Sequence, residues 1–224
     1  MHCLWCFEQI TPQMNWQNIV VLFKPKTLCN QCEGKLDELI GNRCSRCSRI
    51  SEEEVCSDCI WWLRHTGQDV LAYNHSIYTY NSFIQDVIAK WKYRGDYQLG
   101  NVFKQPLMEA FSYKFFKMWP IVVPIPLSEE RLTERGFNQA KMMADFLPGK
   151  SEEILKRVHG EKQSKKTRNE RIFTDNPFIL TKPIKKPVIL VDDIYTTGTT
   201  IRHAAALLKK HGTPEIYSLT LIRG

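Results

Sequence analysis

At 224 residues the chain can hold one full domain and a second, small one, and 43% hydrophobic with 25% charged residues is ordinary for a soluble globular protein. No apolar run approaches the ~18 residues that would span a bilayer, and the first residues have neither the basic nor the apolar region of a secretory signal. The composition therefore predicts neither a membrane-spanning nor an exported protein, and we expect the chain in the cytoplasm.

The chain begins with a cysteine-rich segment, because all eight cysteines form four Cys-x-x-Cys pairs: Cys3/Cys6, Cys29/Cys32, Cys44/Cys47 and Cys56/Cys59. In a chain without an export signal, such pairs are typical of metal ligands rather than disulfides. Two tetrahedral zinc sites would use all eight thiolates. Eight thiolates and two Zn²⁺ ions lower the formal net charge by four, from +7 to about +3, so the basic composition is weak evidence for nucleic-acid binding.

Four pairs can combine into two sites in three ways. The sequential combination closes the shortest loops and costs the least entropy, and a cross-braced arrangement is the main alternative. The sequential sites consist of Cys3, Cys6, Cys29 and Cys32 for the first zinc and of Cys44, Cys47, Cys56 and Cys59 for the second. Residues 1–64 would then be a double zinc ribbon that metal holds together, and residues 65–224 a second domain. The four tryptophans of the first segment either cover its small core or stack on nucleic-acid bases.

Beyond the cysteines, apolar residues recur at helical spacing and then in short runs. A helix is predicted by Phe83, Ile84, Val87, Ile88 and Trp91, with Gly95 as a stop signal. The elements that follow are a helix over about 101–117, a strand over 121–125, a helix near 134–147, short strands at 154–158 and 178–180, a strand at 188–191, a helix at 199–210 and a strand at 216–222. This alternation predicts an α/β fold with a mostly parallel sheet and helices on both faces.

The strand at 188–191 is followed by polar residues with a recognisable chemistry. Asp192 and Asp193 come directly after it, and then a loop of Thr196, Thr197, Gly198, Thr199 and Thr200 that can open the next helix. Adjacent carboxylates can accept hydrogen bonds from neighbouring sugar hydroxyls, and the N–H groups and hydroxyls of such a loop can surround a phosphate. Because ligands of parallel sheets bind at the carboxyl ends of the strands, we predict a ribose-phosphate site here.

Residues 156–171 form a strongly basic segment. It holds seven Lys and Arg residues against two Glu residues and lacks apolar periodicity, which predicts a long loop. Three interpretations stay open: a lid over an anionic substrate, a DNA or RNA contact, and a solvated run of charge.

The segment from Val188 to Thr200 resembles the phosphoribosyl pyrophosphate signature of type I phosphoribosyltransferases. Upstream, Val123-Pro-Ile-Pro-Leu-Ser128 is followed by Arg131-x-x-x-Arg135-Gly-Phe-Asn-Gln139. Together with the cysteine pairs, these motifs are similar to the ComF (late-competence) family over almost the whole chain. Two positions depart from the family pattern, with Lys166 in place of a leucine and Thr174 in place of an asparagine.

The resemblance implies a type I phosphoribosyltransferase-like domain behind an N-terminal double zinc ribbon. It also implies a role in natural transformation, in which the protein helps incoming single-stranded DNA to cross the inner membrane. The implied partners are phosphoribosyl pyrophosphate or a related sugar phosphate, single-stranded DNA, a helicase-like competence protein and a membrane uptake complex. The protein would then act in the cytoplasm, at the inner face of the membrane.

The resemblance assigns roles to the site residues as well. Asp192 and Asp193 would be the catalytic residues and bind the ribose hydroxyls, while the loop Thr196–Thr200 would bind the 5′-phosphate. Mg²⁺ would be held by pyrophosphate and ribose oxygens, which the substrate mainly supplies.

A pyrophosphate-binding set can be argued from physical chemistry. The loop of Ile125, Pro126 and Leu127 would approach the pyrophosphate through backbone N–H groups, while Pro124 and Pro126, which have no N–H, limit its shape. The Arg135 guanidinium would contact phosphate oxygens. For Arg131, a phosphate contact and an exposed helix-start residue stay open. Lys92 and Arg94 either face the same cleft or favour a helix end.

Two functions remain after these steps. The first is a DNA-uptake factor that binds a sugar phosphate. The second is a Mg²⁺-dependent phosphoribosyltransferase, whose acceptor cannot be named because only residues before about Ser82 are left to form an acceptor-binding hood. A zinc-ribbon regulator ranks third, because no helix-turn-helix signal is found.

Overall fold

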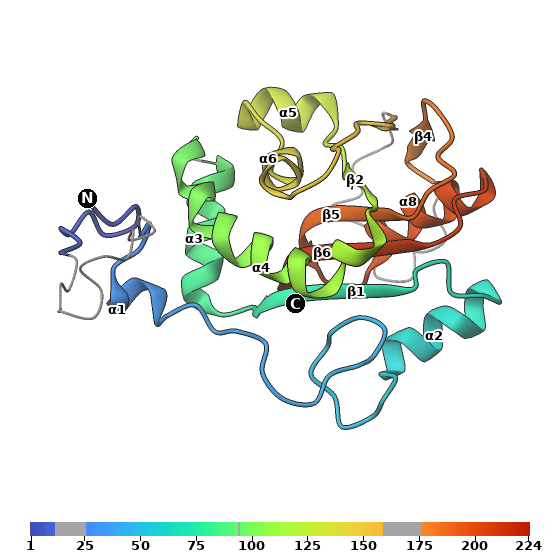
Figure 1. Ribbon diagram of the computed structural model, residues 1–224, viewed down its shortest axis with the longest axis horizontal. Coiled ribbons are helices and arrows are strands. Elements are labelled where there is room, and N and C mark those ends of the chain that lie inside the picture. The colour runs from blue at the N-terminus through green and yellow to red at the C-terminus, as the bar shows by residue number, and fades with distance from the viewer. Residues whose placement is uncertain (12–25, 94, 159–175) are drawn as a thin grey trace.

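The computed structural model describes residues 1–11, 26–93, 95–158 and 176–224. Its centre is a four-stranded sheet in the order β1-β6-β5-β2, in which every neighbouring pair is parallel (Figure 1). These strands are β1 (Tyr73–Thr79), β2 (Ile121–Pro124), β5 (Val188–Tyr195) and β6 (Ile216–Arg223). A small antiparallel pair consists of β3 (Leu155–Arg157) and β4 (Phe178–Leu180).

The helices precede, connect and cover these strands. They are α1 (Asn30–Glu33), α2 (Ser57–Thr66), α3 (Ser82–Tyr93), η1 (Tyr97–Phe103), α4 (Lys104–Lys114), η2 (Phe116–Met118), α5 (Glu129–Arg135), α6 (Gln139–Phe146) and α8 (Thr199–Lys210), where η marks a 3₁₀-helix. Within the described residues, no helix has both the length and the apolar character needed to cross a membrane.

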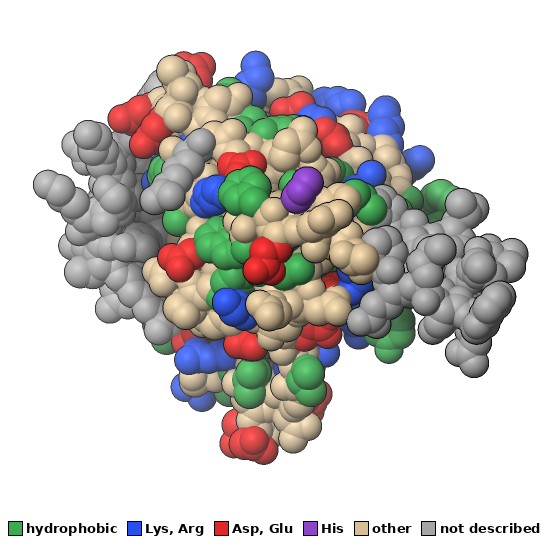
Figure 2. Space-filling model, turned by 90° about the vertical axis from the view of Figure 1, so that its left-hand side faces the viewer, with side chains coloured by type: hydrophobic (Ala, Val, Ile, Leu, Met, Phe, Trp, Pro, Cys, Tyr) green, Lys and Arg blue, Asp and Glu red, His purple; other side chains and the backbone are tan. Residues whose placement is uncertain are grey.

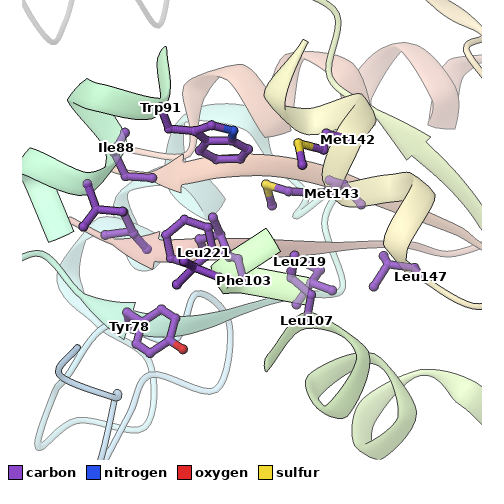
Figure 3. Close-up of a cluster of buried hydrophobic side chains, with 14 of the residues drawn as sticks. Tyr78, Ile88, Trp91, Phe103, Leu107, Met142, Met143, Leu147, Leu219 and Leu221 are labelled. Carbon is purple, nitrogen blue, oxygen red and sulfur yellow. The ribbon is translucent and has the colours of Figure 1, made fainter. Parts of the chain in front are cut away.

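One face of the sheet is covered by α3, η1, α4 and α6. Because side chains alternate between the two faces of a strand, Ile189 and Val191 of β5 both point into this core. Figure 3 shows the cluster, whose labelled members include Trp91, Phe103, Leu107, Met142, Met143, Leu219 and Leu221. The core fixes α3 and α6 beside the carboxyl ends of the strands.

The other face is covered by α8. Val188 and Leu190, the alternate residues of β5, are buried there. They share a cluster with residues of α8 at helical spacing, namely Ile201, Ala204, Ala205 and Leu208. Helices therefore cover both faces of a mostly parallel sheet, and the predicted fold class is confirmed.

The helix predicted near 134–147 is present as α6, but it begins at Gln139 and not near Glu134. The residues before it form a separate helix, α5, because Gly136 has a φ of 77° and ends α5 in the left-handed conformation. Each helix has its own N-cap: the Ser128 side chain accepts from the N–H of Arg131, and the Asn138 side chain accepts from the N–H of Ala140.

The predicted helix over 101–117 is divided as well, into η1, α4 and η2. In η1, Gly100 passes so close to α3 and α6 that an added Cβ would lie 2.7 Å from Met142 and 2.8 Å from Trp91.

Two smaller differences concern strands. β5 runs on through Asp192 and Asp193 to Tyr195. β3 lies within the strand predicted at 154–158, so the first two residues of the basic segment, 156 and 157, are in a strand and not in the predicted loop. Residues 159–171 of the basic segment lie outside the described residues.

β1 and α2 are elements that the sequence did not predict. The buried side chains of β1 are mostly polar, and Asn74 and Ser76 form hydrogen bonds with Ser218 and Thr220 of β6. Such a strand lacks the alternation of apolar and polar residues that marks a half-buried strand.

The outer edge of β1 is bonded by the chain that links the cysteine pairs. Leu39 donates its N–H to the carbonyl of Ile77 at 2.8 Å. At the end of β1, the N–H of Thr79 donates to the carbonyl of Asp37 at 2.9 Å. Asn74 donates to the carbonyl of Arg46 at 2.9 Å. The cysteine-rich segment therefore lies along the sheet.

The cysteines join both apolar cores. Cys3 and Cys32 share a cluster with α3 and β6, whereas Cys44, Cys47, Cys56 and Cys59 share one with α8 and β5. The boundary between residues 64 and 65 stays a prediction, and α2 runs across it.

Figure 2 views the molecule from the left-hand side of Figure 1 and shows acidic and basic side chains interspersed. This face does not present charge of a single sign.

Candidate functional site

The candidate ligand site lies where β5 ends and α8 begins. The two carboxylates are partly buried, and each caps the backbone that follows it. The N–H of Asp193 donates to Oδ1 of Asp192 at 3.0 Å, and the N–H of Ile194 donates to Oδ1 of Asp193 at 2.9 Å. These bonds fix both carboxyl groups at the carboxyl end of a buried strand.

The loop Thr196–Thr200, here called the threonine loop, turns the chain from β5 into α8. Its turn requires glycine, because Gly198 has a φ of 78° and an added Cβ would lie 2.2 Å from the Tyr195 hydroxyl oxygen. The hydroxyls of Thr197 and Thr199 are hydrogen-bonded to each other at 2.8 Å. Gly198 is the N-cap of α8, so the positive end of a 12-residue helix faces the loop.

A cavity of about 190 Å³ opens at this loop. It is lined by residues 194–201 and by two cations, Arg131 of α5 and Arg157 of β3. N–H groups at a helix N-terminus together with two guanidinium groups form an environment suited to an anion such as a phosphate. For Arg131 the sequence left a phosphate contact and an exposed helix-start residue open. In the structure Arg131 is exposed near the start of α5 and also belongs to the cavity wall.

The carboxylates face cations from other elements. Lys92 of α3 forms an ion pair with Asp193, and both side chains are mostly buried. Burial lowers the pKa of Lys92 to about 8 against the attraction of Asp192, and Arg135 and Arg131 lower it further. Burial raises the pKa of the Asp192 carboxyl to about 6, against the opposite effect of Lys92, Arg157 and Arg135. Of the two roles considered for Lys92, the structure supports the one in the cleft.

The predicted pyrophosphate residues lie in the loop after β2 and at the end of α5, outside the cavity wall. Ile125 is buried directly after β2, where its N–H bonds the carbonyl of Val191 at 2.9 Å. Pro126 and Leu127 follow it, partly buried. Arg135 donates to Oε1 of Gln139 at 3.1 Å and to the Tyr93 hydroxyl at 3.4 Å.

Several residues of this region were missed by sequence reasoning. Arg157 was counted in the basic segment and in the strand predicted at 154–158, but its place in the cavity wall was not predicted. Tyr93 follows Lys92, and the Arg135 guanidinium stacks on its ring at 5.2 Å. No pattern in the sequence marks Arg223 or Trp62, which contact the threonine loop from outside.

The structure brings the cysteines together in the sequential combination. Within each group of four, the sulfur atoms all lie within 4.8 Å of one another. We call Cys3, Cys6, Cys29 and Cys32 the first cluster, and Cys44, Cys47, Cys56 and Cys59 the second cluster.

Both clusters fit a tetrahedral metal ion. Zinc–sulfur bonds of about 2.3 Å place the sulfurs of such a site roughly 3.8 Å apart. Measured separations are 3.7 Å for Cys6 and Cys29 and 3.8 Å for Cys44 and Cys59. Two backbone N–H groups, of Arg46 and Cys56, point at the Cys44 sulfur at 3.4 and 3.3 Å. Each cluster can therefore hold a metal ion such as zinc.

The second cluster is also in contact with arginines of the sheet domain. The Arg223 guanidinium lies 3.6 Å from the Cys47 sulfur, and that of Arg202 lies 3.8 Å from the Cys59 sulfur. A hydrogen bond from Cys59 and the charge of Arg223 lower the pKa of the Cys47 thiol to about 5. The thiolate, which is the form that binds metal, is therefore favoured at Cys47. In contrast, burial raises the pKa of Cys56, and a hydrogen bond with Cys47 raises that of Cys59, so a bound ion would have to displace their protons.

A larger hollow, of about 550 Å³, lies between α2 and α8. Trp62, His65, Arg202 and Lys209 belong to its wall, and none of the predicted site residues does. It shares no wall residue with the cavity at the threonine loop.

Comparison with known proteins identifies one matching domain family and two similar competence proteins. The family described as "Phosphoribosyl transferase domain" matches residues 132–224. "Competence protein ComFC" of Bacillus subtilis is 38% identical over 226 residues, which cover 99% of this chain and 94% of that protein. "Competence protein ComFC" of Streptococcus pneumoniae is 30% identical and is covered, like this chain, over 100% of its length.

Among solved structures, a hypoxanthine phosphoribosyltransferase from Staphylococcus aureus is 17% identical and superposes with a TM-score of 0.35. The match covers 55% of this chain and 64% of that one.

Proposed function

Because this chain belongs to the ComF family of competence proteins, we propose that its phosphoribosyltransferase domain binds phosphoribosyl pyrophosphate or a related sugar phosphate. We further propose that the protein uses this pocket while it handles single-stranded DNA that enters the cell in natural transformation. Its further partners would be a helicase-like competence protein and a membrane uptake complex at the inner face of the membrane.

The cavity at the N-terminus of α8 is the observation that carries the proposal. The threonine loop supplies N–H groups and hydroxyls, and Arg131 and Arg157 supply positive charge. A 5′-phosphate placed there would be neutralised without a change in the fold. Because α8 is fixed to the sheet by a buried apolar stripe, this arrangement is in place before the ligand arrives.

The carboxylates would then bind the ribose. Oδ1 of Asp192 is engaged by the backbone of Asp193, so Oδ2 would accept from a sugar hydroxyl. Lys92 neutralises Asp193 in the ligand-free protein, and it would have to share that carboxylate with the second hydroxyl. Mg²⁺ fits as an ion held by ligand oxygens close to Asp192, where it would supply positive charge to a pyrophosphate group.

A catalytic phosphoribosyltransferase is the alternative. The observation that favours it is Tyr93, which is 62% exposed, stacks on Arg135 and follows the residue that binds Asp193. An exposed ring beside a sugar-phosphate pocket could stack on a flat acceptor such as a nucleobase. The reaction would release pyrophosphate, which separates it from binding alone.

The proposal is tested by calorimetry of phosphoribosyl pyrophosphate with Mg²⁺, with and without single-stranded DNA. We expect Asp193→Ala to weaken binding at least tenfold. Asp145→Asn changes a carboxylate on the exposed face of α6, where it pairs with Lys141, and serves as the matched control. A coupling between the two ligands would connect the pocket to DNA handling.

Three outcomes decide between the functions. Unchanged affinity in Asp193→Ala would remove the pocket from the proposal. Independent binding of the two ligands would remove its link to DNA. Release of pyrophosphate with a nucleobase or amine acceptor, lost in Asp192→Asn, would establish the catalytic alternative.

A further inference from the structure

The threonine loop and the residue before it accept hydrogen bonds from two side chains near the second cluster, Arg223 and Trp62. The Arg223 guanidinium donates to the carbonyl of Tyr195 at 3.0 Å and to that of Thr196 at 2.8 Å. The same guanidinium lies 3.6 Å from the Cys47 sulfur. One side chain therefore joins the metal-ligand cluster to the turn that precedes α8.

A second link comes from α2, the helix that carries Cys59. The indole N–H of Trp62 donates to the carbonyl of Thr197 at 2.8 Å. The Arg202 guanidinium lies over the Trp62 ring at 5.1 Å and contacts the Cys59 sulfur. Cys59 and Trp62 are three residues apart on one helix, so a displacement of the cysteine moves the indole as well.

These bonds set the direction of the loop N–H groups. In a trans peptide the carbonyl and the following N–H point in opposite directions, and no cis bond occurs in the described chain. The carbonyls of Tyr195, Thr196 and Thr197 all bond groups on the side of the second cluster. The next three N–H groups, of residues 196–198, consequently point away from the cluster, as a nest for an anion requires.

Charge supports the same coupling. Four thiolates with one divalent ion carry a net charge of about −2. Arg202 and Arg223, which are 3% and 6% exposed, are the cations in contact with these sulfurs. The two arginines offset the charge of the loaded cluster in part, because Arg202 is also paired with the buried Asp69 carboxylate, and each arginine also holds α8 or the loop that precedes it. Without metal, the charges that these buried sulfurs and guanidinium groups present to one another would change.

We propose that the second cluster positions the threonine loop, so that metal in the cluster and an anion in the pocket stabilise each other. Arg223 and Trp62 act as positioning residues in this coupling. The part that concerns the anion rests on the proposed sugar-phosphate function. The part that concerns the order of the loop does not depend on any ligand.

The first experiment measures amide hydrogen exchange of residues 196–200 in the zinc-loaded protein without ligand. We expect Arg223→Met to accelerate exchange of this loop at least fivefold, because its carbonyl contacts are lost. Arg49→Met is the matched control, since Arg49 also lies beside the second cluster but pairs with Asp58 inside the cysteine-rich segment. Unchanged exchange in Arg223→Met would overturn the proposal.

The second experiment measures coupling in a Cys6→Ser background, in which only the second cluster retains a complete ligand set. A chromogenic chelator reports the rate of zinc release with and without ribose 5-phosphate. We expect the sugar phosphate to slow release roughly fivefold or more, and this protection to be lost with Arg223→Met but kept with Arg49→Met. A purely structural arginine would change the release rate but not its dependence on the ligand.

Arg223→Lys sharpens the test because it keeps the charge and removes the planar fork that serves the sulfur and the carbonyls together. We expect zinc to be retained and the protection to be lost. Protection of equal size in wild type and in Arg223→Met would contradict the coupling. If neither ribose 5-phosphate nor phosphoribosyl pyrophosphate binds to the wild type or to Arg223→Met, the proposed function fails. The exchange experiment alone then decides the positioning role.

Discussion

The two cysteine clusters are built alike. In each, a Cys-x-x-Cys turn is followed by a residue with positive φ, Phe7 at 63° and Ser48 at 60°. Each turn is closed by its own isolated antiparallel bridge, between His2 and Gln9 in the first cluster and between Arg43 and Ile50 in the second. The second pair of each cluster begins at the N-cap of a helix, where Cys29 and Cys56 have ψ angles of 161° and 159°. The chain therefore uses one module twice.

Their surroundings differ. Cys6 in the first cluster is exposed, whereas all four cysteines of the second are buried. The first cluster has aromatic and lysine neighbours at the end of α3, where Lys90 lies over the rings of Trp5 and Phe7. The second is enclosed by β1, β6 and α8 and contacts two buried arginines. The same module can thus be partly exposed beside α3 or fully buried beneath a ligand site.

The strongest way to break this comparison is to remove one ligand from each cluster. We expect Cys56→Ser to abolish cooperative folding of the α8 face, because a structural zinc ion contributes about 10–16 kcal/mol to folding in small zinc domains, as much as a whole domain's stability. Cys29→Ser should leave the sheet folded. Thermal unfolding by circular dichroism, with metal content per chain, measures both. Equal losses in the two variants would show that the clusters are equivalent.

A smaller change compares their charged neighbours. Arg202→Met leaves Asp69, which is buried, without its main partner, and we expect a loss of about 3–5 kcal/mol in the free energy of unfolding. Lys26→Met breaks the exposed pair with Glu33 beside the first cluster and should cost about 0–1 kcal/mol. Urea denaturation of the zinc-loaded proteins provides the values. A loss below 1 kcal/mol in Arg202→Met would mean that this pair is not needed.

The pH dependence of ligand binding extends the comparison to the pocket beside the second cluster. The pKa of Asp192 is raised to about 6, so the carboxyl of the ligand-free protein is protonated below that pH and ionised above it. The stability that this raised pKa contributes is fully present below the unfolded pKa of an aspartate, about 4, and is lost as pH rises through 6. Binding of sugar hydroxyls needs the carboxylate and should strengthen about tenfold between pH 5 and pH 7.

The ligand phosphate also ionises near pH 6, and Asp192→Asn separates the two effects. The variant should keep only the part due to the phosphate. We expect the full dependence to survive in Cys6→Ser, which alters the first cluster alone. Calorimetry at pH 5, 6 and 7 gives the three affinities, and an identical pH profile in Asp192→Asn would exclude the carboxyl as its cause.

The smallest expected effect compares one tryptophan from each cluster's surroundings. Trp62→Phe removes the N–H that holds the Thr197 carbonyl and should weaken sugar-phosphate binding by about 0.5–1.5 kcal/mol. Trp5 packs edge-to-face on Phe83 of α3 rather than on the threonine loop, and Trp5→Phe should leave the affinity unchanged. Isothermal titration of both variants is sufficient, and an equal change in the two would argue against a specific role for Trp62.

How much of this could be predicted depended on which interactions hold each element. β5 and α8 were predicted because apolar residues bury them, as at Leu190 and Leu208. β1 was missed because its buried Asn74 and Ser76 are satisfied by hydrogen bonds that only the fold creates. Local turn chemistry at Gly136 outweighed the apolar pattern that had suggested one helix over 134–147.

The candidate site divides in the same way. Asp192, Asp193 and the threonine loop are contiguous, so a motif could mark them. Arg157, Trp62 and Arg223 reach the region from three separate elements, β3, α2 and β6. A contact between residues more than a hundred positions apart, such as Trp62 with Thr197, leaves no local trace in the sequence.

The chain that links the two clusters closes the free edge of β1, from Asp37 and Leu39 to Arg46. An uncovered edge strand is a template for pairing with another molecule. Since both ends of this cover are anchored in cysteine clusters, removal of metal would release it and expose the edge. Chelation is therefore expected to lead to intermolecular strand pairing and precipitation, and bound metal would then also keep the protein in solution.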